Sequence, residues 1–95
     1  MISEAKKERA AYLCSVIKDL SGMDPLEDSR KRDVVSVRMM VAMQLYLEKF
    51  REKEIAELLH RDRVSIYHYE ERWHALYMPG WEAERELWEK FKKAI

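Results

Sequence analysis

The chain has 95 residues, with 18 basic and 18 acidic side chains, so its formal net charge is zero. This length is that of one domain, and we expect a single helical domain over residues 1–95. No apolar run approaches the roughly 18 residues needed to cross a bilayer, which excludes a membrane partner. The single cysteine excludes an internal disulfide and a cysteine-based zinc site. These features predict a cytoplasmic protein, and any surface for nucleic acid must come from the local placement of basic residues.

The composition favours an all-α fold of four to five helices, because the chain has only two glycines and two prolines. Apolar residues at helical spacing predict a first helix from Ser3, its cap, to about Leu20, and Gly22 ends it. A linker over residues 23–28 follows. The next apolar pattern predicts a long central helix that begins near Arg30 or Lys31 and runs to about residue 50.

Two short helices are predicted next, over about residues 52–59 and 62–77, and a last helix over residues 81–95. The short pair is joined by a tight turn, in which His60 stands where glycine is common. Asp62 is a good cap for the second short helix. The two helices carry apolar residues on one face each: Ile55, Ala56 and Leu59 on the first, and Ile66, Tyr69 and Trp73 on the second. This layout is typical of a helix-turn-helix, with the motif region spanning about residues 28–77.

The second helix of a helix-turn-helix enters the DNA major groove, and its first residues touch base edges. Arg63 can donate two hydrogen bonds to guanine O6 and N7, and Val64 can pack on a thymine methyl group. We therefore predict sequence-specific binding to double-stranded DNA. The candidate contacts in the turn and the second helix are Arg61, Asp62, Arg63, Val64, Ser65, Tyr67 and His68. Tyr67 and His68 can also be half-buried helix residues.

Basic residues at the start of the central helix extend the candidate site. The segments Ser29–Met43, Glu54–Leu58 and Arg61–His68 resemble the C-terminal DNA-binding domain of the bacterial replication initiator DnaA. The family's recognition helix begins with Arg-Asp-His-Ser/Thr-Thr-Val-x-His. The resemblance covers about residues 28–73. The positions that match the family's basic loop, its long helix and its motif are Arg30, Arg38, Arg61, Asp62, Ser65 and His68.

The resemblance implies a grip on both grooves. Arg30 would enter the minor groove, and Arg38 would approach the major groove or a phosphate. In the mechanism that we predict, Lys31 and Arg32 join them in holding the backbone and minor groove. Asp62 would cap the helix and accept from a cytosine amino group, and Ser65 would bind a phosphate. Arg63 and Val64 replace the motif's His and Ser/Thr, so we expect a different preferred site. Without the resemblance, the three basic residues at 30–32 can be a solvated cluster, and Arg38 can pair with an acidic neighbour.

No pattern of catalytic residues stands out. The three histidines lack His-Glu-x-x-His spacing, and there is no Gly-x-x-x-x-Gly-Lys-Ser/Thr loop for a nucleotide. We therefore expect no enzyme activity, no cofactor and no metal, and none of the initiator's ATPase.

Other interpretations stay open. The chain can be a helix-turn-helix transcription regulator, or a protein-interaction module with a vestigial helix-turn-helix. In the second case a surface rich in Trp and Met would bind a partner protein or a second copy, although core packing is the favoured role of these residues. On the DNA-binding interpretation, we expect the protein to be associated with the nucleoid.

Overall fold

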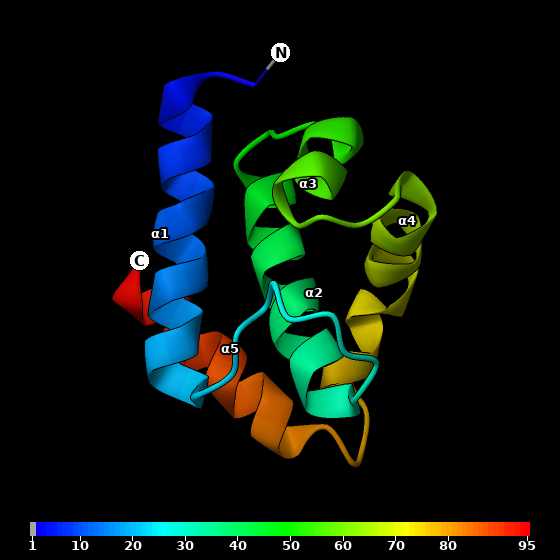
Figure 1. Cartoon of the computed structure of the whole chain (residues 1–95). Helices are drawn as coiled ribbons and strands as arrows, with labels where there is room; N and C mark the ends of the chain where they lie inside the picture. Colours follow the sequence, from blue (N-terminus) through cyan, green and yellow to red (C-terminus); the bar gives the residue numbers. More distant parts are fainter. Residues whose placement is uncertain (1) are drawn as a thin grey trace.

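The structure is a computed structural model that describes residues 2–95, apart from the side chain of Tyr77. It is all-helical, and no strand occurs within residues 2–95. The elements are α1 (Glu4–Ser21), α2 (Arg32–Leu47), α3 (Glu52–Leu58), α4 (Arg63–Arg72), the 3₁₀ helix η1 (Trp73–Tyr77) and α5 (Glu82–Ala94) (Figure 1). The all-α prediction is confirmed. None of the helices described here is both long enough and apolar enough to cross a membrane.

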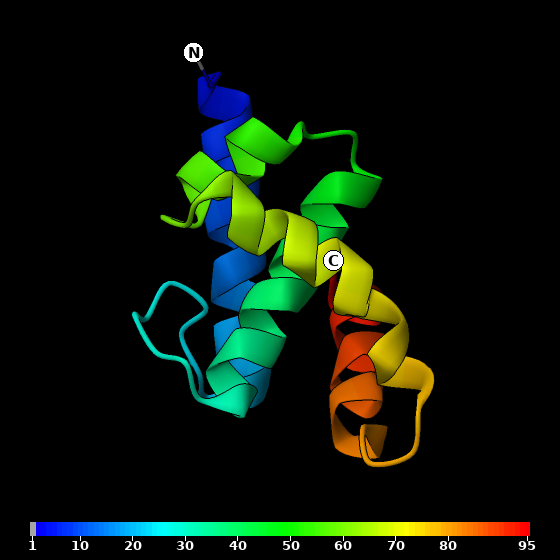
Figure 2. The ribbon, with the colours of Figure 1, turned by 90° about the vertical axis from the view of Figure 1, so that its right-hand side faces the viewer.

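Helix α2 occupies the middle of the molecule, and ten of its 16 residues are buried. It packs against α1, α3 and α4, while α5 packs against α1 and η1. In the side view, α4 crosses the face nearest the viewer, with the α1–α2 linker on one side of it and α5 on the other (Figure 2). The predicted central helix is therefore confirmed, and α4 lies at the surface of the packed core.

Local capping explains where α1 begins and ends. The Ser3 hydroxyl accepts a hydrogen bond from the Lys6 amide at 3.2 Å. Gly22 has a φ of 75°, and its amide donates to the Lys18 carbonyl at 2.7 Å. Both features satisfy backbone groups that a helix end leaves unpaired. The predicted cap and stop are confirmed.

The end of α2 differs from the prediction, because the helix stops at Leu47 and not near residue 50. Lys49 has a φ of 72°. Its amide donates to the Tyr46 carbonyl and the Phe50 amide donates to the Leu45 carbonyl, both at 3.0 Å. These two bonds form a Schellman motif, in which the left-handed position is usually a glycine. A lysine gives no such signal in the sequence, so the stop was not predicted.

The methionines and tryptophans mostly fill the core. Met39, Met40 and Met43 are buried, and Trp88 is 2% exposed. The rings of Trp73 and Trp88 meet edge to face, with centroids 4.6 Å apart, which is a favoured aromatic geometry. These residues therefore pack inside the molecule. The expectation of a Trp- and Met-rich partner surface is wrong for the buried members, because packing already covers them.

Helix α5 is anchored by Phe91, whose side chain is fully buried in the core. We predict that Phe91→Ala lowers the free energy of unfolding by about 3–5 kcal/mol, since it removes a large apolar group and leaves a cavity. Urea denaturation measures this change. The exposed Lys93 of the same helix gives a control, and Lys93→Ala should change stability by less than about 0.5 kcal/mol. Equal effects of the two substitutions would contradict the packing of α5 described here.

Candidate functional site

The turn between α3 and α4 forms without glycine. His60 has a φ of 56°, as its position in the turn predicted. The His60 amide donates to the Glu57 carbonyl at 3.3 Å, and the Arg61 amide donates to the Ala56 carbonyl at 2.9 Å. This is a second Schellman motif, and it satisfies the last carbonyls of α3. The turn therefore ends α3 sharply and directs the chain into α4.

Asp62 fixes the start of α4. Its Oδ1 atom accepts a hydrogen bond from the Ser65 amide at 2.8 Å, which confirms the predicted cap. Bonds from the Ser65 backbone and side chain hold the pKa of the Asp62 carboxyl below its usual value. With this start, Ile66 and Tyr69 face the core, where they are 1% and 7% exposed. The opposite face of α4 is left to solvent.

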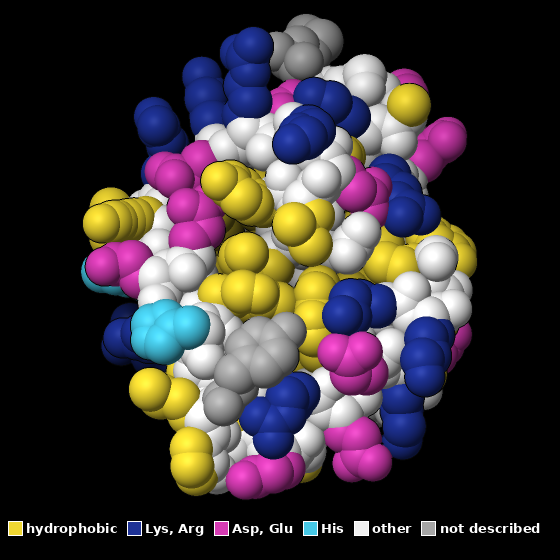
Figure 3. All heavy atoms as spheres, turned by 180° about the vertical axis from the view of Figure 1, so that it is seen from behind, with side chains coloured by type: hydrophobic (Ala, Val, Ile, Leu, Met, Phe, Trp, Pro, Cys, Tyr) yellow, Lys and Arg dark blue, Asp and Glu magenta, His cyan; other side chains and the backbone are white. Residues whose placement is uncertain are grey.

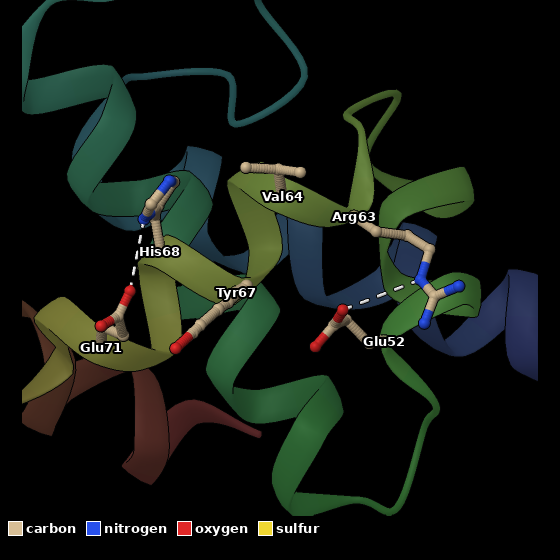
Figure 4. Close-up of a pocket in the computed structure, with 6 residues that line it drawn as sticks. All are labelled: Glu52, Arg63, Val64, Tyr67, His68 and Glu71. Atoms are coloured by element: carbon tan, nitrogen blue, oxygen red, sulfur yellow. Dashed lines mark ion pairs between the residues drawn. The ribbon is translucent and has the colours of Figure 1, made fainter.

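The exposed face of α4 carries residues that the sequence had singled out. Arg63, Val64, Tyr67 and His68 line a shallow depression together with Glu52 of α3 and Glu71 (Figure 4). Val64 is 63% exposed and Tyr67 is 45% exposed. The Tyr67 and His68 rings stack with centroids 5.8 Å apart. Apolar and aromatic side chains held this far out of the core are free to contact a ligand.

An ion pair and a histidine–carboxylate contact lie in this depression. Arg63 Nε lies 3.7 Å from Glu52 Oε1, and His68 Nδ1 lies 3.4 Å from Glu71 Oε1 (Figure 4). The Arg63 side chain is 67% exposed, so the solvent screens its pair with Glu52. Such exposed pairs contribute at most about 1 kcal/mol. Arg63 can therefore exchange Glu52 for another acceptor at small cost.

Arg61 does not point outward with the α4 residues. Its Nη1 lies 3.2 Å from Asp28 Oδ1, and its Nη2 donates to the Glu27 carbonyl at 3.1 Å. These bonds tie the turn to the linker, residues 22–31. The side chain is 21% exposed, and its buried Nε atom has no hydrogen-bond partner among the described residues. Arg61 thus holds the linker beside α4.

Arg38 is the clearest correction among the predicted contacts. It is 2% exposed. Its guanidinium donates to the carbonyls of Pro25 at 3.0 Å, Glu27, and Ser29 at 3.1 Å, and to the Tyr69 hydroxyl at 3.3 Å. The linker and α4 enclose it, so it cannot reach a groove or a phosphate. It orders the linker and is not a surface contact.

The basic residues Arg30, Lys31 and Arg32, at the start of α2, differ in their contacts. Arg30 and Lys31 are exposed. Arg32 lies over the Trp81 ring, 4.0 Å from its centroid, and donates to the Gly80 carbonyl at 2.6 Å. It therefore joins the start of α2 to the segment before α5, and its guanidinium is already engaged.

A basic residue that the sequence analysis missed is Arg72, at the end of α4. It lines two cavities, of about 440 and 880 Å³, and Arg30 lines both as well. Ser65 and His68 line the larger one. Positions 61, 65, 68 and 72 recur at helical spacing, so this edge of α4 could have been found from the sequence. Whether Arg30 lies beside it depends on the course of the linker.

Comparison with known families gives a match for residues 36–78, to the family described as "Putative ATPase subunit of terminase (gpP-like)". The matched segment begins inside α2 and contains α3, α4 and η1. It spans less than half of the 95-residue chain. No curated protein and no solved structure matches the chain significantly.

The resemblance to DnaA is wrong. The segments Glu54–Leu58 and Arg61–His68, which include four of the six matching positions, lie within the residues that match the terminase subunit family. Short patterns of this kind follow from geometry, because any tight helix pair needs inward apolar residues and a polar cap. The resemblance therefore gives no support for Arg30 in the minor groove, or for a cytosine contact by Asp62.

The buried position of Arg38 leads to a prediction for stability. Arg38→Ala leaves linker carbonyls without their donor, and we expect the free energy of unfolding to fall by about 1.5–3 kcal/mol or more. Hydrogen exchange should show lower protection of the Glu27 and Ser29 amides. Arg30→Ala, an exposed change in the same linker, is the control and should leave both measurements almost unchanged. Unchanged exchange in the Arg38 variant would contradict its role.

The Asp62 cap leads to a prediction for acid. Because the pKa of its carboxyl is lowered in the folded state, its ionised form contributes stability at neutral pH. This contribution is lost as the pH falls below about 4 and passes through the folded pKa. Asp62→Asn keeps a good capping residue without the charge. We expect the wild type to be the more stable at pH about 7, and the difference to vanish in acid. A difference that is independent of pH would contradict this.

Proposed function

We propose that α3 and α4 form a helix-turn-helix that binds double-stranded DNA, with α4 in the major groove. The observation that supports this most is the two-sided character of α4. One face is buried through Ile66 and Tyr69, while Arg63, Val64 and Tyr67 project from the other. A surface helix with one face packed on the core and side chains on the other face that can contact bases suits recognition in the major groove.

The exposed residues have chemistry suited to base edges. Arg63 matches the acceptors of guanine, and Val64 matches the methyl group of thymine. Tyr67 and His68 lie one turn further along, where they can reach bases or phosphates. Asp62 stays the cap of α4, and its carboxylate already accepts a hydrogen bond from the Ser65 amide. Arg63 leaves Glu52 when it binds, since their exposed pair is weak.

The match to a terminase subunit family agrees with a role on DNA. That family is described as an ATPase subunit, yet the 95 residues hold only two glycines and no Gly-x-x-x-x-Gly-Lys-Ser/Thr loop. We propose that this chain supplies DNA binding and that these residues hydrolyse no nucleotide.

A second candidate function is contact with another protein. Seen from behind, apolar side chains gather in the middle of the molecular face and charged side chains surround them (Figure 3). Large apolar residues are also exposed at the end of α2, where Tyr46 is 49% and Leu47 is 56% accessible. Exposed apolar surface of this kind often marks a protein interface. This role is compatible with DNA binding, because α4 uses other residues.

Selection of bound duplexes from a random library tests the proposed function. We expect a preferred site to emerge, and Arg63→Ala to lower discrimination at one base pair by about 1–3 kcal/mol. Lys90→Ala, an exposed change on α5, is the control and should leave the preferred site unaltered. The absence of duplex binding at both low and moderate salt would overturn the proposal. A preferred site that Arg63→Ala leaves intact would remove Arg63 from the reading residues.

A further inference from the structure

We propose that the groove between the linker and α4 holds the phosphates of one DNA strand, so that α4 lies in the major groove with its linker-facing edge against that strand. This inference rests on the proposed function and adds the orientation of the complex. We call this feature the arginine groove. It consists of the residues common to the two adjoining cavities, which are Arg30, Val35, Tyr69 and Arg72.

The arginine groove carries two guanidinium groups that are free to bind. Arg30 and Arg72 are exposed, and neither forms an ion pair with any residue between 2 and 95. By contrast, Arg32, Arg61 and Arg63 are paired with Glu84, Asp28 and Glu52. Guanidinium groups without internal partners are the ones that gain most from phosphate oxygens, which they bind with charge-assisted hydrogen bonds.

A third positive charge lies below the groove. Arg38 lines the larger cavity, and its guanidinium bonds to carbonyl groups and to the Tyr69 hydroxyl, all of which are neutral. No carboxylate of the described residues pairs with it, so its charge is not cancelled locally. A charge buried in low dielectric acts over a longer range than one in water. Arg38 therefore raises the positive potential of the arginine groove without touching a ligand.

The other edge of α4 is acidic. Glu52 lies on α3, beside Arg63 of α4, and lines the shallow depression, whereas Glu71 lies on the outer face of α4 beside His68 (Figure 4). Burial, and to a smaller extent the charge of Glu52, raise the pKa of the Glu70 carboxyl. Carboxylates repel phosphates. A duplex that approaches α4 is thus attracted by Arg30 and Arg72 at the linker side, where Asp62 is the one carboxylate that lines the larger cavity, and is repelled by Glu52 and Glu70 at the α3 side.

The charges on the two edges of α4 indicate which ligand binds and where it lies. The two guanidinium groups of the arginine groove come from different segments of the chain. The larger cavity continues from the groove past Ser65 and His68 to the start of α4. A site of this extended form suits a row of phosphates better than a single anion. The side chains that read bases begin at that same end of α4. One strand in the arginine groove would therefore bring base edges to Arg63 and Val64.

The salt dependence of binding tests this inference. Fluorescence anisotropy with a duplex of about 30 base pairs measures the association constant at several salt concentrations. The slope of its logarithm against the logarithm of the salt concentration counts the phosphate contacts. We expect the double variant Arg30→Ala, Arg72→Ala to reduce the magnitude of the slope by about 1.8, which corresponds to two lost phosphate contacts. The matched control, Lys90→Ala, Lys93→Ala, removes the same charge from exposed positions on α5 and should keep the wild-type slope.

Four outcomes bear on this inference, and the first two separate it from the proposed function. If the wild type does not bind duplex, the proposed function fails. If the wild type binds but both double variants have equal slopes, the function stands and the arginine groove is overturned. The variant Arg30→Lys, Arg72→Lys keeps the charges, and we expect it to restore most of the slope, which a purely structural role would not predict. Equal competition by a polyglutamate peptide of matched charge would show a general anion surface and would also overturn the inference.

Discussion

The buried guanidinium of Arg38 is the interaction on which the rest of this structure depends. It projects from the central helix and donates to the Pro25, Glu27 and Ser29 carbonyls and to the Tyr69 hydroxyl. One side chain thereby joins α2, the linker and α4. Because a buried carbonyl such as that of Pro25 must find a donor, movement of the linker away from Arg38 costs free energy. The position of Arg30 beside α4 follows from this network, and so does the arginine groove.

The short connection between α3 and α4 is the second constraint. It holds the helices close with a residue that usually avoids the left-handed region, His60, and with the Asp62 cap. The cost of the unusual backbone is offset by two backbone hydrogen bonds and by burial of Leu59 and Ile66. The result is a helix that is rigidly seated on its inner face. Its outer residues can therefore be presented in a fixed order to a partner.

The zero net charge of the chain is compatible with a DNA-binding surface, because some basic side chains form ion pairs within the molecule and others do not. Four arginines form ion pairs within the described residues, among them Arg9 with Glu48 at 2.8 Å and Arg32 with Glu84 at 3.4 Å. Arg30 and Arg72 are not paired within the described residues, and they lie along the same groove. Net charge is a sum over the whole surface, whereas a ligand responds to the local field.

The sequence by itself determined the order of the helices, the caps at Ser3 and Asp62 and the stop at Gly22, because these depend on residues a few positions apart. It predicted one helix over about residues 62–77, whereas α4 ends at Arg72 and the 3₁₀ helix η1 follows. It did not determine the stop at Lys49, where a residue without the usual signal adopts a positive φ. It also gave a wrong family, since a short pattern that any tight helix pair requires carries little information on ancestry. Only the tertiary structure decided that Arg38 is internal and that Arg30 and Arg72 share a groove. These facts depend on how the linker folds back over α2 and α4, and that is set by contacts between residues far apart in the chain.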